Sequence, residues 1–334
     1  MPARRRIPSW LLQAIGYGLS AGCLFWVLRG YPLDELLPSI RSLDWKWVTL
    51  AVIADLAVYV VHGWRWNTLL SPVARLGFWT TVQAIYIGLF ANEVLPLRVG
   101  ELIRCYLLAH WNNLRLSLSF ASAAVERIID GLWMLVAFML TAGFVRALPR
   151  DLTLSVQIFG GLLILATAFL FWIVSHKRHA HVVLGENRWA STIRHIMEGL
   201  QLMGNRKTLS LTTLISLLYF VLQIVFVYAL MKAYGLDLSF WVAAGVLTIV
   251  RLTTAVPNAP GNIGLLNFAV TLALRLFEVE QNDAKTFSLI FYAVQTFPLL
   301  IAGAIATALT GTNIGELRDR AREHMNAVHA DAAE

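Results

Sequence analysis

Charged residues are scarce in this chain. Asp, Glu, Lys and Arg together make up 14% of its 334 residues, against about 25% in an ordinary soluble domain. Hydrophobic residues account for 58%, and the mean hydropathy is +0.64. This composition excludes a soluble globular domain, and it predicts an all-α polytopic integral membrane protein because helices satisfy their own backbone groups in lipid.

Cysteines and catalytic motifs are also scarce. Cys23 and Cys105 are the only cysteines, so no disulfide framework or cysteine metal site is expected. No H-E-x-x-H motif or P-loop occurs, which argues against ATP-driven pumping by this chain alone. His176, His179 and His181 are crowded in a basic loop, but no cysteine or carboxylate set completes a metal site there. We therefore expect no metal, no cofactor and no catalytic residue.

Apolar runs long enough to cross a bilayer, about 20 residues each, alternate with polar segments. They lie at 10–28, 46–63, 117–145, 153–174, 208–232 and 286–309. Two further apolar regions, 78–111 and 240–277, are interrupted by proline and glycine. Since these residues break helices, each region is predicted to be a re-entrant helical hairpin or a close helix pair that returns to its starting side.

Basic residues between the spans set the orientation. Clusters at 4–6, 175–207 and 318–322, together with Arg65 and Arg75, fall on one side of this layout, and the segments on the other side are richer in acidic residues. The positive-inside rule therefore places both termini in the cytoplasm. The pI of 9.6 is attributed to these topology signals, so nucleic acid is not expected as a partner.

The layout contains an inverted-topology repeat. Residues 10–145 and 153–309 each comprise two spans, a broken hairpin and a further span, but they start from opposite faces. Both belong to one transmembrane domain over 1–314, and 315–334 is a polar cytoplasmic tail. In transporters, broken helices at corresponding positions of inverted halves indicate a substrate site near the bilayer midplane.

Ionisable and amide side chains gather at the two breaks and on the span after the first break. A charge at bilayer depth costs about 2.5 kcal/mol or more, so it normally faces a partner, a cavity or a substrate. Because guanidinium groups bind phosphate oxygens bidentately, the arginines favour an anionic headgroup. The candidate substrate-binding residues are Asn92, Glu93, Arg98, Glu101, Arg104, Glu126, Arg127, Asp130, Arg251, Asn258, Asn262 and Asn267, and the candidate hinge residues are Pro96, Gly100, Pro257, Pro260, Gly261 and Gly264.

Structural explanations of the same residues stay open. Glu126 and Asp130 are four residues apart and repel, so one of them is expected to be protonated or paired elsewhere, for instance with Arg104 or Arg251. A buried network that only braces helices would use the same charges. Asp55, in the middle of a span, is a candidate proton carrier, although contact with a cavity or a neighbour is favoured.

Three blocks carry a family resemblance. They are Asn92-x-x-x-Pro96-x-Arg98-x-Gly100-Glu101-x-x-Arg104, Glu126-Arg127-x-x-Asp130 and Pro257-x-x-Pro260-Gly261-x-x-Gly264. In this order they resemble the lysylphosphatidylglycerol synthase transmembrane region, also called the flippase-like domain family, over roughly residues 10–310. The resemblance implies a cell inner membrane protein that moves a phospholipid, glycolipid, hopanoid or polyprenyl-linked lipid between leaflets, with lipid-biosynthesis enzymes as candidate partners.

Two departures from the family qualify this expectation. The soluble aminoacyl-transferase domain of lysyl-lipid synthases is not found, so lysylation is not expected. Many relatives carry an acid or glutamine where this chain has Asn267, which weakens a cation or proton site there. The leading hypothesis is a lipid translocator. The alternatives are a membrane glycosyl or acyl transferase with Glu126 or Asp130 as base, and an accessory scaffold of a lipid or glycolipid pathway.

Overall fold

The computed structural model describes residues 9–95, 99–144, 203–254 and 259–312, with four isolated positions at 154, 160, 161 and 165. Every regular element in these ranges is a helix, which confirms the predicted all-α class. The elements are α1 (Ser9–Leu28), η1 (Leu33–Glu35), α2 (Leu36–Arg41), α3 (Trp45–Leu70), α4 (Phe78–Val94), α5 (Gly100–Trp111), α6 (Leu116–Phe144), α10 (Arg206–Tyr234), α11 (Phe240–Thr253), η3 (Pro260–Asn262), α12 (Leu265–Leu276) and α13 (Gln281–Thr310).

Three of these helices, α3, α10 and α13, are long and apolar enough to cross a membrane by length and composition. They correspond to the predicted runs at 46–63, 208–232 and 286–309. The runs at 10–28 and 117–145 form α1 and α6, which have 20 and 29 residues. The predicted span at 153–174, apart from those isolated positions, and the tail at 315–334 lie outside the described residues. The protein is therefore a multi-pass helical membrane protein.

Local signals set the ends of the long helices. Asp44 precedes α3 and accepts a hydrogen bond from the Lys46 amide at 2.9 Å, and Asn205 caps α10 through the Lys207 amide at 3.2 Å. Both are typical N-caps. Gly235 ends α10 in the left-handed conformation, with φ of 87°, as glycine commonly does at a C-terminus. Helix α3 then packs along α10 to form the centre of the bundle.

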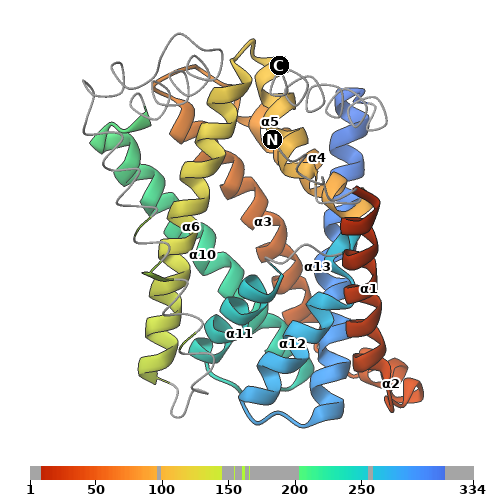
Figure 1. The fold of residues 1–334 in the computed structure, drawn as a ribbon. Coiled ribbons are helices and arrows are strands. Elements are labelled where there is room, and N and C mark those ends of the chain that lie inside the picture. The colour runs from red at the N-terminus through yellow and green to blue at the C-terminus, as the bar shows by residue number, and fades with distance from the viewer. Residues whose placement is uncertain are drawn as a thin grey trace, which may run out of the picture.

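Each interrupted apolar region folds as a pair of shorter helices. In Figure 1 the pair α4 and α5 lies toward the upper end of the molecule, whereas α11 and α12 lie toward the lower end. The first turn joins α4, which ends at Val94, to α5, which begins at Gly100, and the second turn joins α11, which ends at Thr253, to α12, which begins at Leu265. Four candidate residues at these turns, Pro96, Arg98, Pro257 and Asn258, lie outside the described residues. The second turn contains η3, which packs against α4, so the two interrupted regions meet inside the molecule.

The second turn is shaped by glycine and held by α1. Gly261 and Gly264 have φ of 67° and 80°, a region that glycine enters without steric cost, and Pro260 begins η3. The Ala259 amide donates to the Ser20 hydroxyl at 3.0 Å. Ser20 lies in a G-x-S-x-G pentapeptide, but this pentapeptide is part of helix α1 rather than the strand-to-helix turn of a hydrolase nucleophile.

Helices α4 and α5 make their closest approach at two glycines. A Cβ on Gly100 would lie 1.8 Å from the Gly88 carbonyl oxygen, a backbone atom that cannot move aside without shifting α4. We expect Gly100→Ala to separate these helices and lower stability by about 1–3 kcal/mol, as overpacking does. Thermal unfolding in detergent measures the effect.

Gly22→Ala is the matched control, because a Cβ at Gly22 in α1 meets nothing within 4 Å. Its melting temperature should equal or exceed that of the wild type. Equal melting temperatures for the two variants would contradict the close approach of α4 and α5.

Candidate functional site

A cluster of five ionisable side chains is enclosed between helices α3, α5 and α6. The buried charge network consists of His62, Arg65, Arg104, Glu126 and Asp130. Glu126 is 0% exposed and accepts hydrogen bonds from Arg65 Nε and Arg104 Nη1, both at 3.1 Å. His62 Nε2 lies 3.0 Å from Arg104 Nη1. One carboxylate is thus the shared partner of two buried cations.

Arg65 joins the two carboxylates that the spacing on α6 predicts to repel. It binds Asp130 through a close Nη1 contact and through Nη2 at 3.3 Å, while its Nε holds Glu126. Of the two arginines that the sequence suggested as partners for one of these carboxylates, Arg104 pairs with Glu126. The assignment of Arg65 to a cytoplasmic segment is wrong, because α3 continues to Leu70 and the Arg65 side chain is 0% exposed. Both carboxylates therefore have arginine partners.

Aromatic rings enclose the two network arginines. The Arg65 guanidinium carbon lies 4.6 Å from the Tyr219 ring centroid, and that of Arg104 lies 4.8 Å from the Trp66 ring. Trp66 in turn donates to the Ser122 hydroxyl at 2.8 Å. Cation–π contacts of this kind gain strength when they are desolvated. The network is thereby packed as an interior element that joins three helices.

A cavity of about 440 Å³ lies beside the network, within the range of small-molecule sites. Unlike the network, two of its charged side chains are open: Arg127 and Glu101 are 46% and 43% exposed and form a close ion pair. Arg251, from α11, also lines the cavity. The full lining is Asn92, Glu101, Arg127, Asp130, Gly131, Met134, Tyr219, Phe220, Arg251 and Thr254. We call this space the large cavity, and it is lined by one arginine from each half of the predicted repeat, Arg127 and Arg251.

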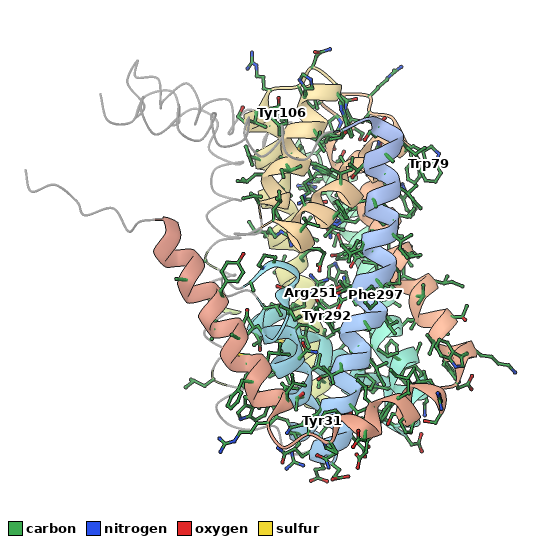
Figure 2. The ribbon with its side chains drawn as sticks, turned by 90° about the vertical axis from the view of Figure 1, so that its right-hand side faces the viewer. Tyr31, Trp79, Tyr106, Arg251, Tyr292 and Phe297 are labelled. Carbon is green, nitrogen blue, oxygen red and sulfur yellow. The ribbon has the colours of Figure 1, made fainter. Side chains whose placement is uncertain are left out.

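Arg251 occupies a central position along the molecule. Figure 2 shows it near mid-height, between Tyr106 toward one end and Tyr31 toward the other. Its Nη2 donates to the Gln223 side-chain oxygen at close range and lies 3.5 Å from the Tyr219 hydroxyl. Because the Tyr219 ring also contacts Arg65, this tyrosine links the buried charge network to the large cavity.

The candidate residues divide into three groups. Those that line the large cavity or the smaller one next to it are Asn92, Glu93, Glu101, Arg127, Asp130, Arg251 and Asn262. Arg104 and Glu126 belong to the buried charge network. Asn267 is in neither lining, since it accepts from the Gly264 amide at 3.2 Å and donates to the Ser288 carbonyl at 3.0 Å. Its contacts are those of a residue that fixes the start of α12.

Among the residues at the site that were not predicted as site residues are His62, Arg65, Tyr219 and Gln223. A local signal exists for each pair. His62 and Arg65 are three residues apart and Tyr219 and Gln223 are four apart, so each pair shares a helix face. Polar side chains on one face of a span indicate that this face is turned to the interior rather than to lipid.

The amino-acid sequence of this chain matches a known protein family. Residues 13–303 match the Lysylphosphatidylglycerol synthase TM region. A UPF0104 membrane protein of Methanothermobacter thermautotrophicus is 21% identical over 89% of this chain and 92% of its own length. Another UPF0104 membrane protein, from Methanocaldococcus jannaschii, is 23% identical over 68% of this chain and 96% of its own length. The chain belongs to the Lysylphosphatidylglycerol synthase TM region family, which confirms the resemblance seen in the three sequence blocks.

A further relative carries an enzyme name. The protein named Glycosyltransferase AglD, from Haloferax volcanii, is 23% identical over 87% of this chain. The alignment covers 54% of that protein. A large part of that relative thus has no counterpart in the match.

Proposed function

We propose that this member of the Lysylphosphatidylglycerol synthase TM region family is a translocator that moves the anionic headgroup of a lipid or lipid-linked molecule between leaflets. The proposal rests on the large cavity, which is lined by Arg127 from α6 and by Arg251 from α11. Two guanidinium groups facing one space suit phosphate oxygens, which they bind in a bidentate manner.

The present contacts of the two arginines are exchangeable. Arg127 pairs with the open Glu101 carboxylate, and Arg251 binds the neutral Gln223 amide. A phosphate entering the cavity would replace these partners and leave the pairs of Glu126 with Arg65 and Arg104 in place. We therefore assign headgroup binding to Arg127 and Arg251, and bracing of α3, α5 and α6 to Glu126 with Arg65 and Arg104.

The arrangement of the helices supports alternating access. We propose six full spans, with the α4–α5 and α11–α12 pairs as re-entrant hairpins of two inverted halves in the inner membrane, and with both termini cytoplasmic. The opposite placement of the two pairs (Figure 1) and the packing of η3 on α4 agree with this layout. Rocking of one half against the other would then expose the large cavity to each side in turn.

A membrane-embedded transferase is the second candidate, because one relative is named a glycosyltransferase. Glu126 is an unsuitable base, since it is buried and held by two arginines. Asp130 lines the large cavity but is bound by Arg65. An enzyme would leave a covalently changed lipid, which lipid mass spectrometry detects, whereas a scaffold would retain no lipid in the large cavity.

Native mass spectrometry of the purified protein tests headgroup binding. We expect the wild type to retain anionic lipid and Arg251→Gln to lose it, because glutamine supplies neither the charge nor the planar fork of donors. Lys232→Gln is the matched control, since Lys232 pairs with the 97% exposed Asp237 side chain at the end of α10. Equal retention of anionic lipid by Arg251→Gln and the control would contradict the assignment.

A further inference from the structure

A smaller cavity of about 150 Å³ adjoins the large one, and oxygen acceptors from four elements line it. They come from Asp55 on α3, Glu93 on α4, Asn262 in η3 and Gln295 on α13. The two interrupted regions meet at this point, because a Cβ on Gly261 would lie 2.8 Å from Glu93 Oε2. We call this space the small cavity.

Three oxygen atoms in the lining accept no hydrogen bond. They are Asp55 Oδ2, Asn262 Oδ1 and Gln295 Oε1. Asp55 as a whole is only 4% exposed. A buried acceptor without a partner costs about 1–3 kcal/mol, so three of them on residues of one cavity lining call for an explanation. A cation bound among these residues would supply the positive partner that such acceptors lack.

The net charge of the residues that line the small cavity also favours a cation. Among its described residues are three carboxylates, Asp55, Glu93 and Glu101, and two guanidinium groups, Arg127 and Arg251. With His62 neutral, the lining carries a net charge of −1. Glu101 and Arg127 pair with each other, so Asp55, Glu93 and Arg251 set the field in the rest of the small cavity.

The class of cation follows from the donor set. Within the part of the chain that the structure describes, no group of three or more His, Cys, Asp or Glu side chains is placed to hold a metal ion. Carboxylate and amide oxygens suit hard cations rather than soft ones. A lining charge of −1 is balanced by a single positive charge, which favours a monovalent cation over calcium or magnesium.

We propose that the small cavity binds one monovalent cation, a sodium ion or a proton, with Asp55 as its principal ligand. The role of the cation in transport rests on the proposed lipid translocation, but the existence of the cation site does not. Arg251 lines both cavities and its charge acts on Asp55. A cation that neutralises Asp55 would release Arg251 toward a headgroup in the large cavity, and such mutual dependence is a coupling between two sites.

Other titratable groups lie around Asp55, and each of them contributes to the pH dependence of the melting temperature. On its own helix Tyr59 and His62 line the small cavity together with Asp55. From the packed helices, α4 contributes Glu93, α10 contributes Tyr219 and α11 contributes Arg251. A comparison of the wild type with an Asp55 variant isolates the contribution of Asp55, because these neighbours are common to both proteins.

Thermal unfolding of the purified protein tests the cation site without any transport. Sodium chloride is compared with choline chloride at equal ionic strength, and pH is varied in sodium-free buffer. We expect the wild-type melting temperature to rise by roughly 2 °C or more with sodium for a sodium site, or to depend on pH alone for a proton site. Asp55→Asn should lose the dependence, and the conservative Asp55→Glu should keep it with an altered midpoint.

Asp237→Asn is the control, because Asp237 lies in the loop after α10 and is exposed. It should behave like the wild type. A wild-type melting temperature that depends on neither sodium nor pH would overturn the proposal, whether or not Asp55→Asn folds. The same dependence in Asp55→Asn as in the wild type would also overturn it.

Lipid transfer in vesicles with an imposed sodium or proton gradient separates this inference from the proposed function. A rate of lipid transfer that does not change with either gradient would refute the coupling to the cation but not the proposed translocation. Cation-dependent stability in a protein that moves no lipid would refute the translocator and leave the cation site intact.

Discussion

Replacing Glu126 with glutamine is expected to destabilise the protein by about 3–5 kcal/mol, the cost of removing one partner from a buried ion pair. The Glu126 carboxylate is 0% exposed and binds Arg65 and Arg104 at 3.1 Å each. Glutamine keeps the shape but removes the shared charge, so that Arg65 retains Asp130 and Arg104 retains only the longer contact of 3.6 Å with the half-exposed Glu101 carboxylate. Unfolding monitored by heat or denaturant in detergent measures the loss.

A surface ion pair provides the matched control for Glu126→Gln. Lys232 Nζ lies 2.6 Å from the exposed Asp237 carboxylate, and this hydrogen bond lowers the pKa of Asp237 below its ordinary value. Since solvent screens such pairs, Lys232→Gln should leave the melting temperature unchanged. We also expect Arg104→Met to restore part of the stability lost in Glu126→Gln, because the second change removes the buried charge that has lost its closer partner. A Glu126→Gln protein as stable as Lys232→Gln would show that the network does not brace the helices.

The interrupted helices could be predicted from the sequence because proline and glycine leave a direct local signal. The regions 78–111 and 240–277 became the α4–α5 and α11–α12 pairs, with ends at Trp111 and Leu276. Capping and turn residues act on their immediate neighbours, so no knowledge of the tertiary structure is needed to interpret them. The need of the two like charges on α6 for a partner could also be predicted, but the sequence did not decide between Arg104, Arg251 and protonation, and the structure pairs Arg104 with Glu126.

The rotation of each helix about its axis could not be predicted in the same way. Arg65 follows directly after an apolar run, so hydropathy alone assigned it to a loop, whereas the structure turns it toward Glu126 and Asp130. A helix in lipid is apolar on its outer face as well as its packed face, which weakens the periodic pattern that orients helices in water. The linings of the two cavities depend on this rotation, and Tyr219 and Gln223 escaped prediction for the same reason.

The transfer of a fluorescent anionic lipid across the bilayer of reconstituted vesicles measures the proposed translocation itself. Arg127 is the variant to use, because it faces the large cavity, is half exposed and pairs only with open or partly open carboxylates in the described structure, Glu101 and Asp130. Loss of a charged hydrogen bond costs about 1.5–3 kcal/mol, so Arg127→Gln should slow transfer by at least about tenfold while the protein stays folded. The transfer rate of Arg127→Lys should lie between those of the wild type and Arg127→Gln, since lysine keeps the charge but not the bidentate geometry.

Arg41→Gln, on the exposed face of α2, is the control and should transfer lipid at the wild-type rate. The measurement follows the fraction of labelled lipid that a membrane-impermeant quencher can reach over time. We predict rapid quenching of both leaflets with the wild type and Arg41→Gln, and quenching limited to the outer leaflet with Arg127→Gln. Wild-type transfer by a folded Arg127→Gln protein would contradict a headgroup site between Arg127 and Arg251.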